Sequence, residues 1–367
     1  ALLVKLSNVS KLALFAAASC SGVKVIFFSV CIRGLSTFVA LHKYKYSFKN
    51  TAVKLKNEKK WTIHEVKAFY TDHFVLPLPS GHRFPMEKYK MLRDQVSDLE
   101  GIYLFEAPKI ADHLLALAHD AEYIERVNHG LLSSAEQREI GFPWSSEMVE
   151  RSKRSAGATL EAAKTALTDK VAVNLAGGTH HAYRDKGSGF CVFNDAAITA
   201  LYLYREHGLR VAIIDLDVHQ GNGTAAILKE HPSIFTLSLH GDKNFPFRKE
   251  SGSLDISLPD GCEDELYLDE LSKALSIMQN NFKPQFVIYL AGADPHEGDR
   301  LGRLRLSKSG MAQRDQKVFK LCEQSGCPVA VAMAGGYGHS IQTTVDVHVQ
   351  TIQLALAHHQ KNKAFYA

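Results

Sequence analysis

The stretch RVAIIDLDVHQGNG at residues 210–223 contains the pattern that decides the fold. It starts with a short apolar run, Arg210–Asp215, and then becomes polar and Gly-rich. Near-continuous apolar runs of this length are typical of strands in a parallel sheet that is covered on both faces. Because similar runs recur along the chain, we expect further strands at Val171–Leu175, Ile234–Leu239, Phe286–Leu290 and Val329–Met333.

Segments with helical character alternate with these strands. They occupy Ser146–Leu167, Asn194–His207, Glu263–Asn280, Ser307–Glu323 and Thr343–His359. Repeated strand–helix units predict an α/β fold with three α/β/α layers, a mostly parallel central sheet and right-handed crossovers. We expect one domain of this kind over residues 61–367, a length that a single α/β unit often has.

Residues 1–60 have a different composition. The first 57 residues contain nine Lys or Arg and no Asp or Glu. An apolar, Ser-containing and basic leader is typical of a transit peptide, although a disordered extension or an anchor stays open. Its uninterrupted apolar pieces are shorter than the roughly 20 residues that a membrane helix needs. We expect a plastid or mitochondrion if the leader is a targeting signal, and otherwise the cytoplasm or nucleus.

The rest of the chain is acidic. Residues 58–367 carry 34 basic and 39 acidic side chains, a net charge of −5 against +4 for the whole chain. Nucleic-acid binding depends on clustered Lys and Arg. We therefore expect no direct nucleic-acid binding, and the short apolar pieces of the leader lead us to expect no membrane span.

Four of the expected strands run directly into polar or Gly-rich segments. These segments contain His180-His181, Asp217-Val218-His219, Asp294 and Gly336-Tyr337. In parallel α/β sheets, ligands bind just beyond the carboxyl ends of the strands. The four segments should therefore meet at one edge of the sheet, which predicts a functional site there.

The residue types in these segments indicate metal-assisted hydrolysis. In an extended backbone, Asp215, Asp217 and His219 point the same way, so Asp217 and His219 can converge on one cation. Asp294 is the natural third ligand, and two carboxylates with one imidazole suit a catalytic zinc. The alternative is that these acids only cap helices or form loop salt bridges.

The other two segments supply proton donors and acceptors. Imidazoles such as His180 and His181 titrate near neutral pH and suit general acid–base catalysis. The hydroxyl of Tyr337 can stabilise an oxyanion. Each of these residues alone would equally fit a role in packing.

Together the motifs resemble the histone deacetylase and acetylpolyamine amidohydrolase family. They run in the family's order over roughly residues 70–360, and the segment 291–302 looks like the class IV branch with its bacterial and plant relatives. The segments that match the family's motifs are Ala176–Ala182, Gly189–Cys191, Asp215–Gly223, Ala293–Asp294 and Gly335–Tyr337.

The resemblance implies a zinc-dependent hydrolase of acyl-lysine amides, a histone or other protein deacetylase that would act in chromatin regulation in the histone case. It implies Zn²⁺ on Asp217, His219 and Asp294. His181 would be the general base for the attacking water, with His180 beside it and bonded to Asp215. Tyr337 would hold the substrate carbonyl.

The resemblance also assigns residues around this centre. Asn222, where many members carry an acid, would bond His181 and leave it less basic than in those members. The acyl-lysine tunnel would be lined by Phe190, Phe245, Gly189 and Leu301. A potassium ion would lie beneath the zinc, held by Asp215, Ser238 and the backbone of Asp217, His219 and Leu239.

Three other functions stay open. The same site could hydrolyse acetylpolyamines or long-chain acyl-lysine. A binuclear manganese hydrolase of the arginase type would need Asp-x-His-x-Asp, but Gly221 stands where the next acid should be. A non-catalytic binding module would tolerate loss of Tyr337 or Asp294, and both are present.

Overall fold

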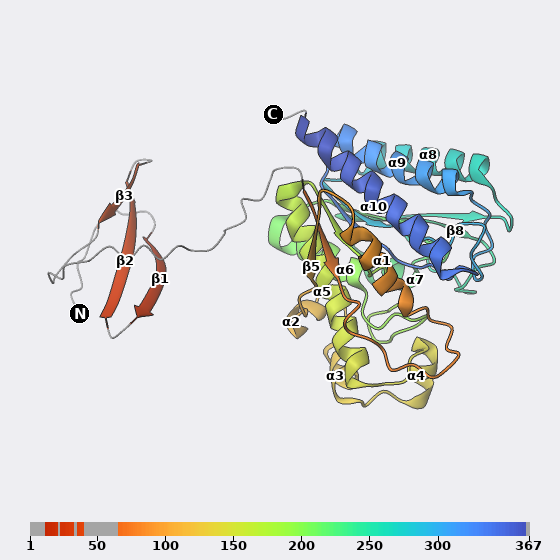
Figure 1. The fold of residues 1–367 in the computed structure, drawn as a ribbon, viewed down its shortest axis with the longest axis horizontal. Coiled ribbons are helices and arrows are strands. Elements are labelled where there is room, and N and C mark those ends of the chain that lie inside the picture. Colours follow the sequence, from red (N-terminus) through yellow and green to blue (C-terminus); the bar gives the residue numbers. More distant parts are fainter. Residues whose placement is uncertain (1–11, 21–22, 33–34, 40–64, 365–367) are drawn as a thin grey trace. The chain divides into compact units, whose positions relative to one another are not determined.

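The computed structural model describes residues 12–20, 23–32, 35–39 and 65–364, with side chains for residues 65–361 (Figure 1). The chain divides into two compact units, Ala1–Lys60 and Trp61–Ala367. In the first unit, the strands β1 (Leu12–Cys20), β2 (Val23–Ile32) and β3 (Leu35–Val39) form an antiparallel sheet in that order. Their Val, Ile and Phe residues favour strands, although we did not expect strands there. The targeting role expected for this leader stays a prediction, and part of the leader (residues 1–11, 21–22, 33–34 and 40–60) lies outside the described residues.

The second unit contains an eight-stranded sheet in which every neighbouring pair is parallel. Five strands match the expected ones: β6 (Val171–Asn174), β7 (Val211–Asp215), β8 (Ile234–Gly241), β10 (Phe286–Leu290) and β11 (Val329–Ala332). Three more lie toward the edges: β4 (Val66–Tyr70), β5 (Ile102–Glu106) and β9 (Leu254–Leu258). The order is β5-β4-β6-β11-β10-β7-β8-β9.

Helices cover both faces of this sheet, as the sequence predicted (Figure 1). One face packs against α5 (Ser146–Asp169), α6 (Asp195–His207) and α7 (Asn222–Leu228). The other packs against α1 (Glu87–Ser97), α8 (Asp264–Asn281), α9 (Lys308–Ser325) and α10 (Ile341–Ala364). Each interface is a buried apolar core, so packed helices hold both faces of the sheet in place.

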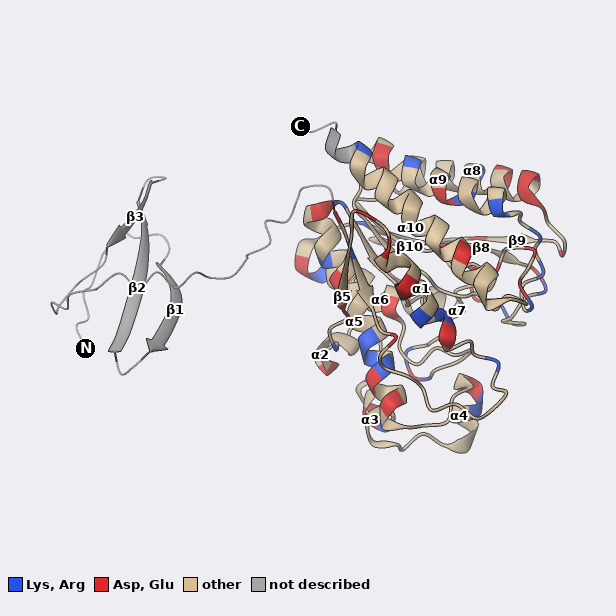
Figure 2. Ribbon diagram, in the orientation of Figure 1, with Lys and Arg blue, Asp and Glu red and all other residues tan. Residues whose placement is uncertain are grey.

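Short helices lie between β5 and α5: α2 (Asp112–Leu115), α3 (Ala121–His129) and α4 (Ser134–Ile140). Several helices start at residues whose side chains accept a backbone N–H of the first turn, namely Ser145 before α5, Asn194 before α6 and Ser307 before α9. Acidic and basic residues are interspersed along the outer helices (Figure 2). Among the described residues, no helix combines the length and the apolar character needed to cross a membrane.

Candidate active site

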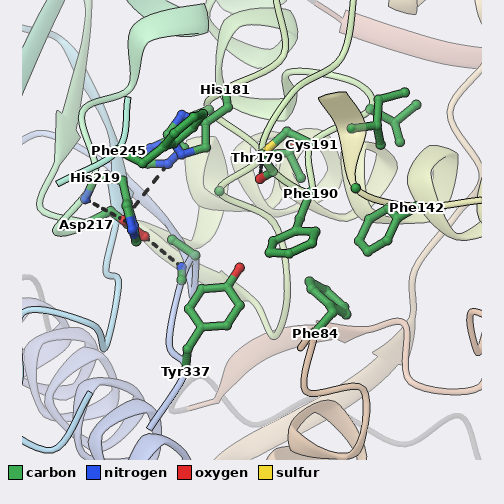
Figure 3. A pocket seen from close by; sticks show the side chains of 18 of the residues that line it. Phe84, Phe142, Thr179, His181, Phe190, Cys191, Asp217, His219, Phe245 and Tyr337 are labelled. Atoms are coloured by element: carbon green, nitrogen blue, oxygen red, sulfur yellow. Dashed lines mark hydrogen bonds and ion pairs between the residues drawn. The ribbon is translucent and has the colours of Figure 1, made fainter. Parts of the chain in front are cut away.

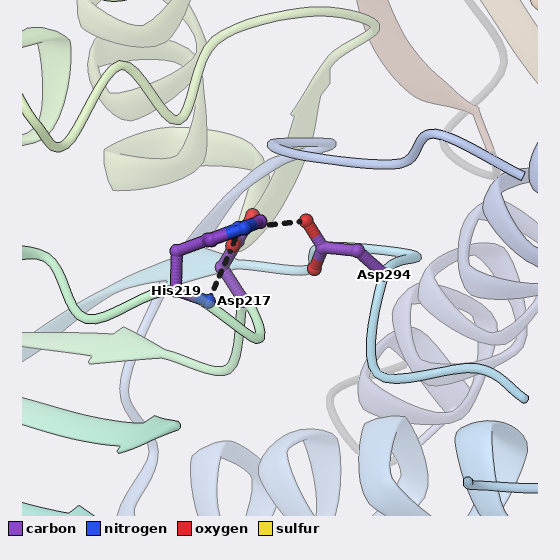
Figure 4. A group of neighbouring side chains, drawn as sticks. All are labelled: Asp217, His219 and Asp294. Atoms are coloured by element: carbon purple, nitrogen blue, oxygen red, sulfur yellow. Dashed lines mark hydrogen bonds and ion pairs between the residues drawn. The ribbon is translucent and has the colours of Figure 1, made fainter. Parts of the chain in front are cut away.

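Asp217, His219 and Asp294 lie together at the carboxyl ends of β7 and β10, which are adjacent in the sheet (Figure 4). The Nδ1 atom of His219 is 2.9 Å from Asp217 Oδ1 and 3.2 Å from Asp294 Oδ2. One ligand atom from each of the three residues lies within 4.8 Å of the others, and all three side chains are buried. The structure therefore brings together the three residues expected to bind the metal.

The reason for their convergence differs from our expectation. Strand β7 ends at Asp215, so residues 217–219 are not extended strand and the two-residue period does not orient them. Instead, backbone N–H groups hold the carboxylates: His219 donates to Asp217 Oδ1 at 2.9 Å and Val218 donates to Asp294 Oδ1 at 2.9 Å. Gly335 donates to Asp217 Oδ2 at 2.8 Å. Hydrogen bonds from the loops after β7 and β11 therefore fix the positions of the two carboxylates.

The residues of this cluster fit a divalent cation. Apart from its contact with His219 Nδ1 at 3.2 Å, the fully buried Oδ2 atom of Asp294 has no hydrogen-bond partner among the described residues. A Cβ at Gly335 would collide with the Oδ2 atoms of both Asp217 and Asp294, so only glycine leaves this space open. Two carboxylates and one imidazole with space beside them are a ligand set that zinc uses in catalytic sites.

The pKa values reflect two carboxylates buried side by side. Burial, followed by repulsion from Asp217, raises the pKa of Asp294 to about 7. Burial opposes the charged form of His219, but its hydrogen bonds to Asp217 and Asp294 outweigh this and raise its pKa to about 10. Buried carboxylates of this kind need a positive partner. The cluster therefore attracts cations.

His180 and His181 follow β6, and their rings lie 4.1 Å apart. His180 Nδ1 is 2.7 Å from Asp215 Oδ2. Burial would lower the pKa of His180, but the charges of Asp215 and Asp217 outweigh it and raise the pKa to about 9. These two carboxylates therefore favour the charged form of His180.

His181 has a different partner. Its Nδ1 is 2.7 Å from Asn222 Oδ1, and the amide of Asn222 donates to the Tyr183 hydroxyl at 2.8 Å. Burial and the nearby charges of His180 and His219 lower the pKa of His181 well below its usual value. The amide oxygen places the proton on Nδ1 and leaves Nε2 able to accept one.

Tyr337 lies in the loop after β11, and its hydroxyl points into a cavity (Figure 3). Its backbone N–H donates to Asp299 Oδ2 at 2.6 Å. Burial raises the pKa of Tyr337 well above its usual value, so its hydroxyl stays protonated and able to donate. The buried ammonium of Lys88 donates to the carbonyls of Ala334 at 3.4 Å and Gly336 at 3.3 Å, which ties this loop to α1.

The cavity has a volume of about 490 Å³ and aromatic walls. Phe84, Phe142 and Phe190 contact one another edge to face or tilted, and Phe190 lies 6.0 Å from the Tyr337 ring (Figure 3). The backbone of Phe190 has φ 67°, which bulky residues rarely adopt, and its N–H donates to the carbonyl of Ile140 at 2.6 Å. This unusual conformation points the ring into the cavity.

The other expected tunnel residues also line this cavity. Phe245 lies edge-on to His181, with ring centres 4.9 Å apart. A Cβ at Gly189 would come within 2.7 Å of the His181 ring and 3.0 Å of the Phe245 ring, so glycine is required there. Leu301 lines the cavity on the side of Asn244, which donates to the Leu301 carbonyl at 2.8 Å.

The residues expected to hold potassium lie deeper. Asp215 and Ser238 are paired in register on β7 and β8, and Leu239 follows Ser238. Ser238 Oγ is 2.9 Å from His240 Nδ1, and burial lowers the pKa of His240 to about 4. The potassium site itself stays a prediction.

Several residues of the site were not predicted from the sequence. Phe84, Lys88 and Phe142 line the cavity but come from segments without a strand-end motif. The fully buried Arg314 of α9 was missed as well. Its guanidinium donates to the carbonyls of Gly292 at 2.6 Å and Leu216 at 3.3 Å, and so connects the loops that carry all three metal-ligand candidates. No repeated pattern in the sequence marks these residues.

Comparison with known proteins connects this site to a family. The family described as "Histone deacetylase domain" matches residues 82–352. An uncharacterised protein of Picosynechococcus sp. is 41% identical over 76% of this chain and 94% of its own length. Histone deacetylase 2 of Arabidopsis thaliana is 35% identical over 50% of this chain and 49% of its own length. Acetoin utilization protein AcuC of Bacillus subtilis is 30% identical over 65% of this chain and 67% of its own length.

Solved structures share the fold. A crystal structure of an HDAC homolog complexed with SAHA superposes with a TM-score of 0.69 at 24% identity, over 79% of this chain and 84% of that one. An HDAC homolog from Aquifex aeolicus has a TM-score of 0.67 at 23% identity over the same shares. At this level of identity, these structures establish the α/β architecture of the second unit.

Proposed function

The chain belongs to the histone deacetylase family of the arginase/deacetylase superfamily, and on that premise we propose that it is a zinc-dependent hydrolase of acyl-lysine amides. The observation that carries the proposal is the buried Asp217, His219 and Asp294 cluster, which lies beside two histidines and a protonated tyrosine in one cavity. Bound there, zinc would polarise the amide carbonyl and lower the pKa of the attacking water.

His181 and Tyr337 would act directly on the reacting atoms. Neutral His181 would accept a proton from water at Nε2 as the water oxygen attacks the amide carbon. The Tyr337 hydroxyl would donate to the carbonyl oxygen as that oxygen gains negative charge. When the C–N bond breaks, His181 would return the proton to the lysine nitrogen, which gives the free amine and a carboxylic acid; the remaining proton of the acid would then pass to the amine, so that the products leave as ammonium and carboxylate.

His180 and Asn222 would support this chemistry. The positive charge of His180, stabilised by Asp215, would lie beside the developing negative charge. The hydrogen bond from His181 Nδ1 to Asn222 would hold the ring with Nε2 toward the substrate. We also propose a potassium ion, held by Asp215, Ser238 and the backbone of Asp217, His219 and Leu239, as a structural support for these strand ends.

A second candidate is a deacylase for chains longer than acetyl. An acyl group longer than acetyl would contact more of the aromatic side chains that line the cavity, among them Phe84, Phe142 and Phe190. Burial of each further methylene in such a space contributes about 0.8 kcal/mol. The resemblance of residues 291–302 to class IV enzymes allows the same activity. Histone or other proteins would be the substrate in either case.

The test is an assay of the full zinc-loaded chain against acetyl-lysine and long-chain acyl-lysine peptides and acetylspermidine. We expect acyl release from the peptides that Asp217→Ala abolishes, together with loss of bound zinc in that variant. Asp269→Ala, an exposed substitution on α8, is the matched control and should behave as the parent protein. A folded, zinc-loaded protein that releases no acyl group would overturn the proposed function.

A further inference from the structure

The mouth of the cavity, defined by Arg83, Arg138, Lys243, Phe247 and Arg303, is basic although the chain around it is acidic. All five side chains are exposed and line the cavity entrance. The surrounding residues 58–367 carry a net charge of −5. Positive charge is therefore concentrated at the opening and contrasts with the body that contains it.

Few carboxylates neutralise this charge. Glu139 is the one exposed acidic side chain among the described residues that line the cavity, and it pairs with Lys186 at 2.8 Å. Asp260 is shared between two cations, at 3.1 Å from Arg303 and 3.9 Å from Lys243. The entrance therefore keeps a positive charge after these pairs are formed.

Arg83 and Arg138 are the clearest source of that charge. No carboxylate of the described residues lies within ion-pair distance of either guanidinium. Arg83 lies over the Phe190 ring, 5.9 Å from its centre, and Phe190 in turn faces Tyr337. This arrangement places a free cation directly above the wall of the acyl-lysine tunnel, next to where the chain flanking the lysine would pass.

An exposed aromatic accompanies the cations. The side chain of Phe247 is 86% exposed, and its ring lies 6.3 Å from Phe245, which contacts His181. An exposed aromatic at the entrance offers an apolar surface to a peptide, whereas a small polyamine has no apolar side chain to place there. The positive charge and the exposed aromatic therefore both favour a peptide over a small polyamine as the substrate.

Resting on the proposed function, we infer that Arg83 and Arg138 select acyl-lysines in acidic protein segments and disfavour acetylpolyamines and basic histone-like tails. Opposite charges raise the encounter rate and the affinity of acidic peptides, and like charges repel lysine-rich peptides and the ammonium groups of a polyamine. Because the arginines are exposed, water and salt weaken the effect. The selection therefore depends on ionic strength.

The experiment uses the full zinc-loaded chain and three acetyl-lysine peptides that differ only in their flanking residues, Glu, Gln or Lys, together with acetylspermidine. We expect kcat/KM to fall by about tenfold from the Glu to the Lys peptide at low salt and the difference to shrink at high salt. The Arg83→Gln/Arg138→Gln variant should lose most of this preference. The charge-retaining Arg83→Lys/Arg138→Lys variant should keep it.

Arg205→Gln is the matched control, because Arg205 is exposed on α6 and does not line the cavity. It should leave the preference unchanged. Equal or reversed kcat/KM values for the three peptides, or a preference that persists in the double Gln variant, would overturn the inference.

Peptide affinity, measured by fluorescence anisotropy on the same variants, separates this inference from the proposed function. If no peptide is hydrolysed but the acidic one binds more tightly and loses this advantage in the double Gln variant, the catalytic proposal fails and the selection stands. If hydrolysis occurs without any charge preference, the catalytic proposal stands and the selection by Arg83 and Arg138 fails.

Discussion

The floor of the cavity and its mouth are built in opposite ways. The floor is buried and comes from the ends of four adjacent strands. Its residues are Asp217, His219, Asp294, His180, His181 and Tyr337. The mouth is exposed and comes from helix ends and loops. Burial makes each floor residue sensitive to its hydrogen-bond partners, whereas water surrounds and screens the residues of the mouth. Substitutions should therefore have large effects on the floor and small effects on the mouth.

The largest effect is expected for Tyr337→Phe, which removes only the hydroxyl. Loss of one donor to a developing oxyanion costs about 10²–10³-fold in kcat. The affinity for a substrate peptide should change little, because the ring and its contact with Phe190 remain. Steady-state kinetics and peptide binding on the same zinc-loaded sample test this.

The exposed Tyr204→Phe on α6 is the matched control for Tyr337→Phe. An unchanged kcat in Tyr337→Phe would remove this residue from the chemistry.

A smaller effect is expected for Arg314→Lys, which tests whether the floor is supported from behind. Lysine keeps a positive charge, but its single ammonium cannot do what the planar guanidinium does, which is to donate to Asp315 through Nε and to the carbonyls of Gly292 and Leu216 through Nη1. Outer hydrogen-bond partners of metal ligands typically contribute 10–100-fold in metal affinity. We expect a loss in that range, measured by competition with a zinc chelator.

Thermal unfolding distinguishes positioning from general destabilisation in Arg314→Lys. The matched substitution Lys317→Arg, three residues along the same helix, should leave zinc affinity unchanged. If Arg314→Lys lowers the melting temperature but not zinc affinity, Arg314 acts only in the core.

The sequence predicted the floor better than the mouth for a physical reason. Buried strands need continuous apolar runs, and the polar residues directly after them must converge at one sheet edge, so Asp217 and Asp294 could be placed together without a structure. Three strands were missed: β9 alternates apolar and polar residues and lacks such a run, β4 is interrupted by Lys67, and β5, which carries the apolar run Ile102–Phe105, lies partly exposed at the edge of the sheet.

The mouth offered no comparable pattern. Arg83 lies over the ring of Phe190, whose positive φ could not be predicted from its residue type. Arg314 was missed because a buried guanidinium on a helix has the same sequence signature as an exposed one. The two-residue period was also the wrong reason for the convergence of Asp217 and His219, which loop hydrogen bonds produce.

Asn222→Asp should change the pH dependence of the floor without disrupting it. The new carboxylate would accept the hydrogen bond from His181 Nδ1 and stabilise its charged form, so the pKa of His181 would rise. Because His181 must be neutral to accept a proton, the acidic limb of the pH–kcat profile should move to higher pH, by about 1–3 units. Activity at low pH would fall.

The matched control for this pH shift is Asn280→Asp, an exposed substitution on α8. It should leave the profile unchanged. An acidic limb that stays in place in Asn222→Asp would show that position 222 does not set the basicity of His181.

The smallest effect is expected at the mouth, for Phe247→Ala. This ring is 86% exposed, and truncation of a side chain at the rim of a binding site usually costs less than about 1 kcal/mol, or roughly fivefold. The loss should appear in KM for peptides with an apolar residue next to the acyl-lysine. It should be absent for a free acyl-lysine amide, which does not reach the ring. Equal losses for both substrates would mean that Phe247 acts through Phe245 and the floor, and the distinction between the two regions would fail at that point.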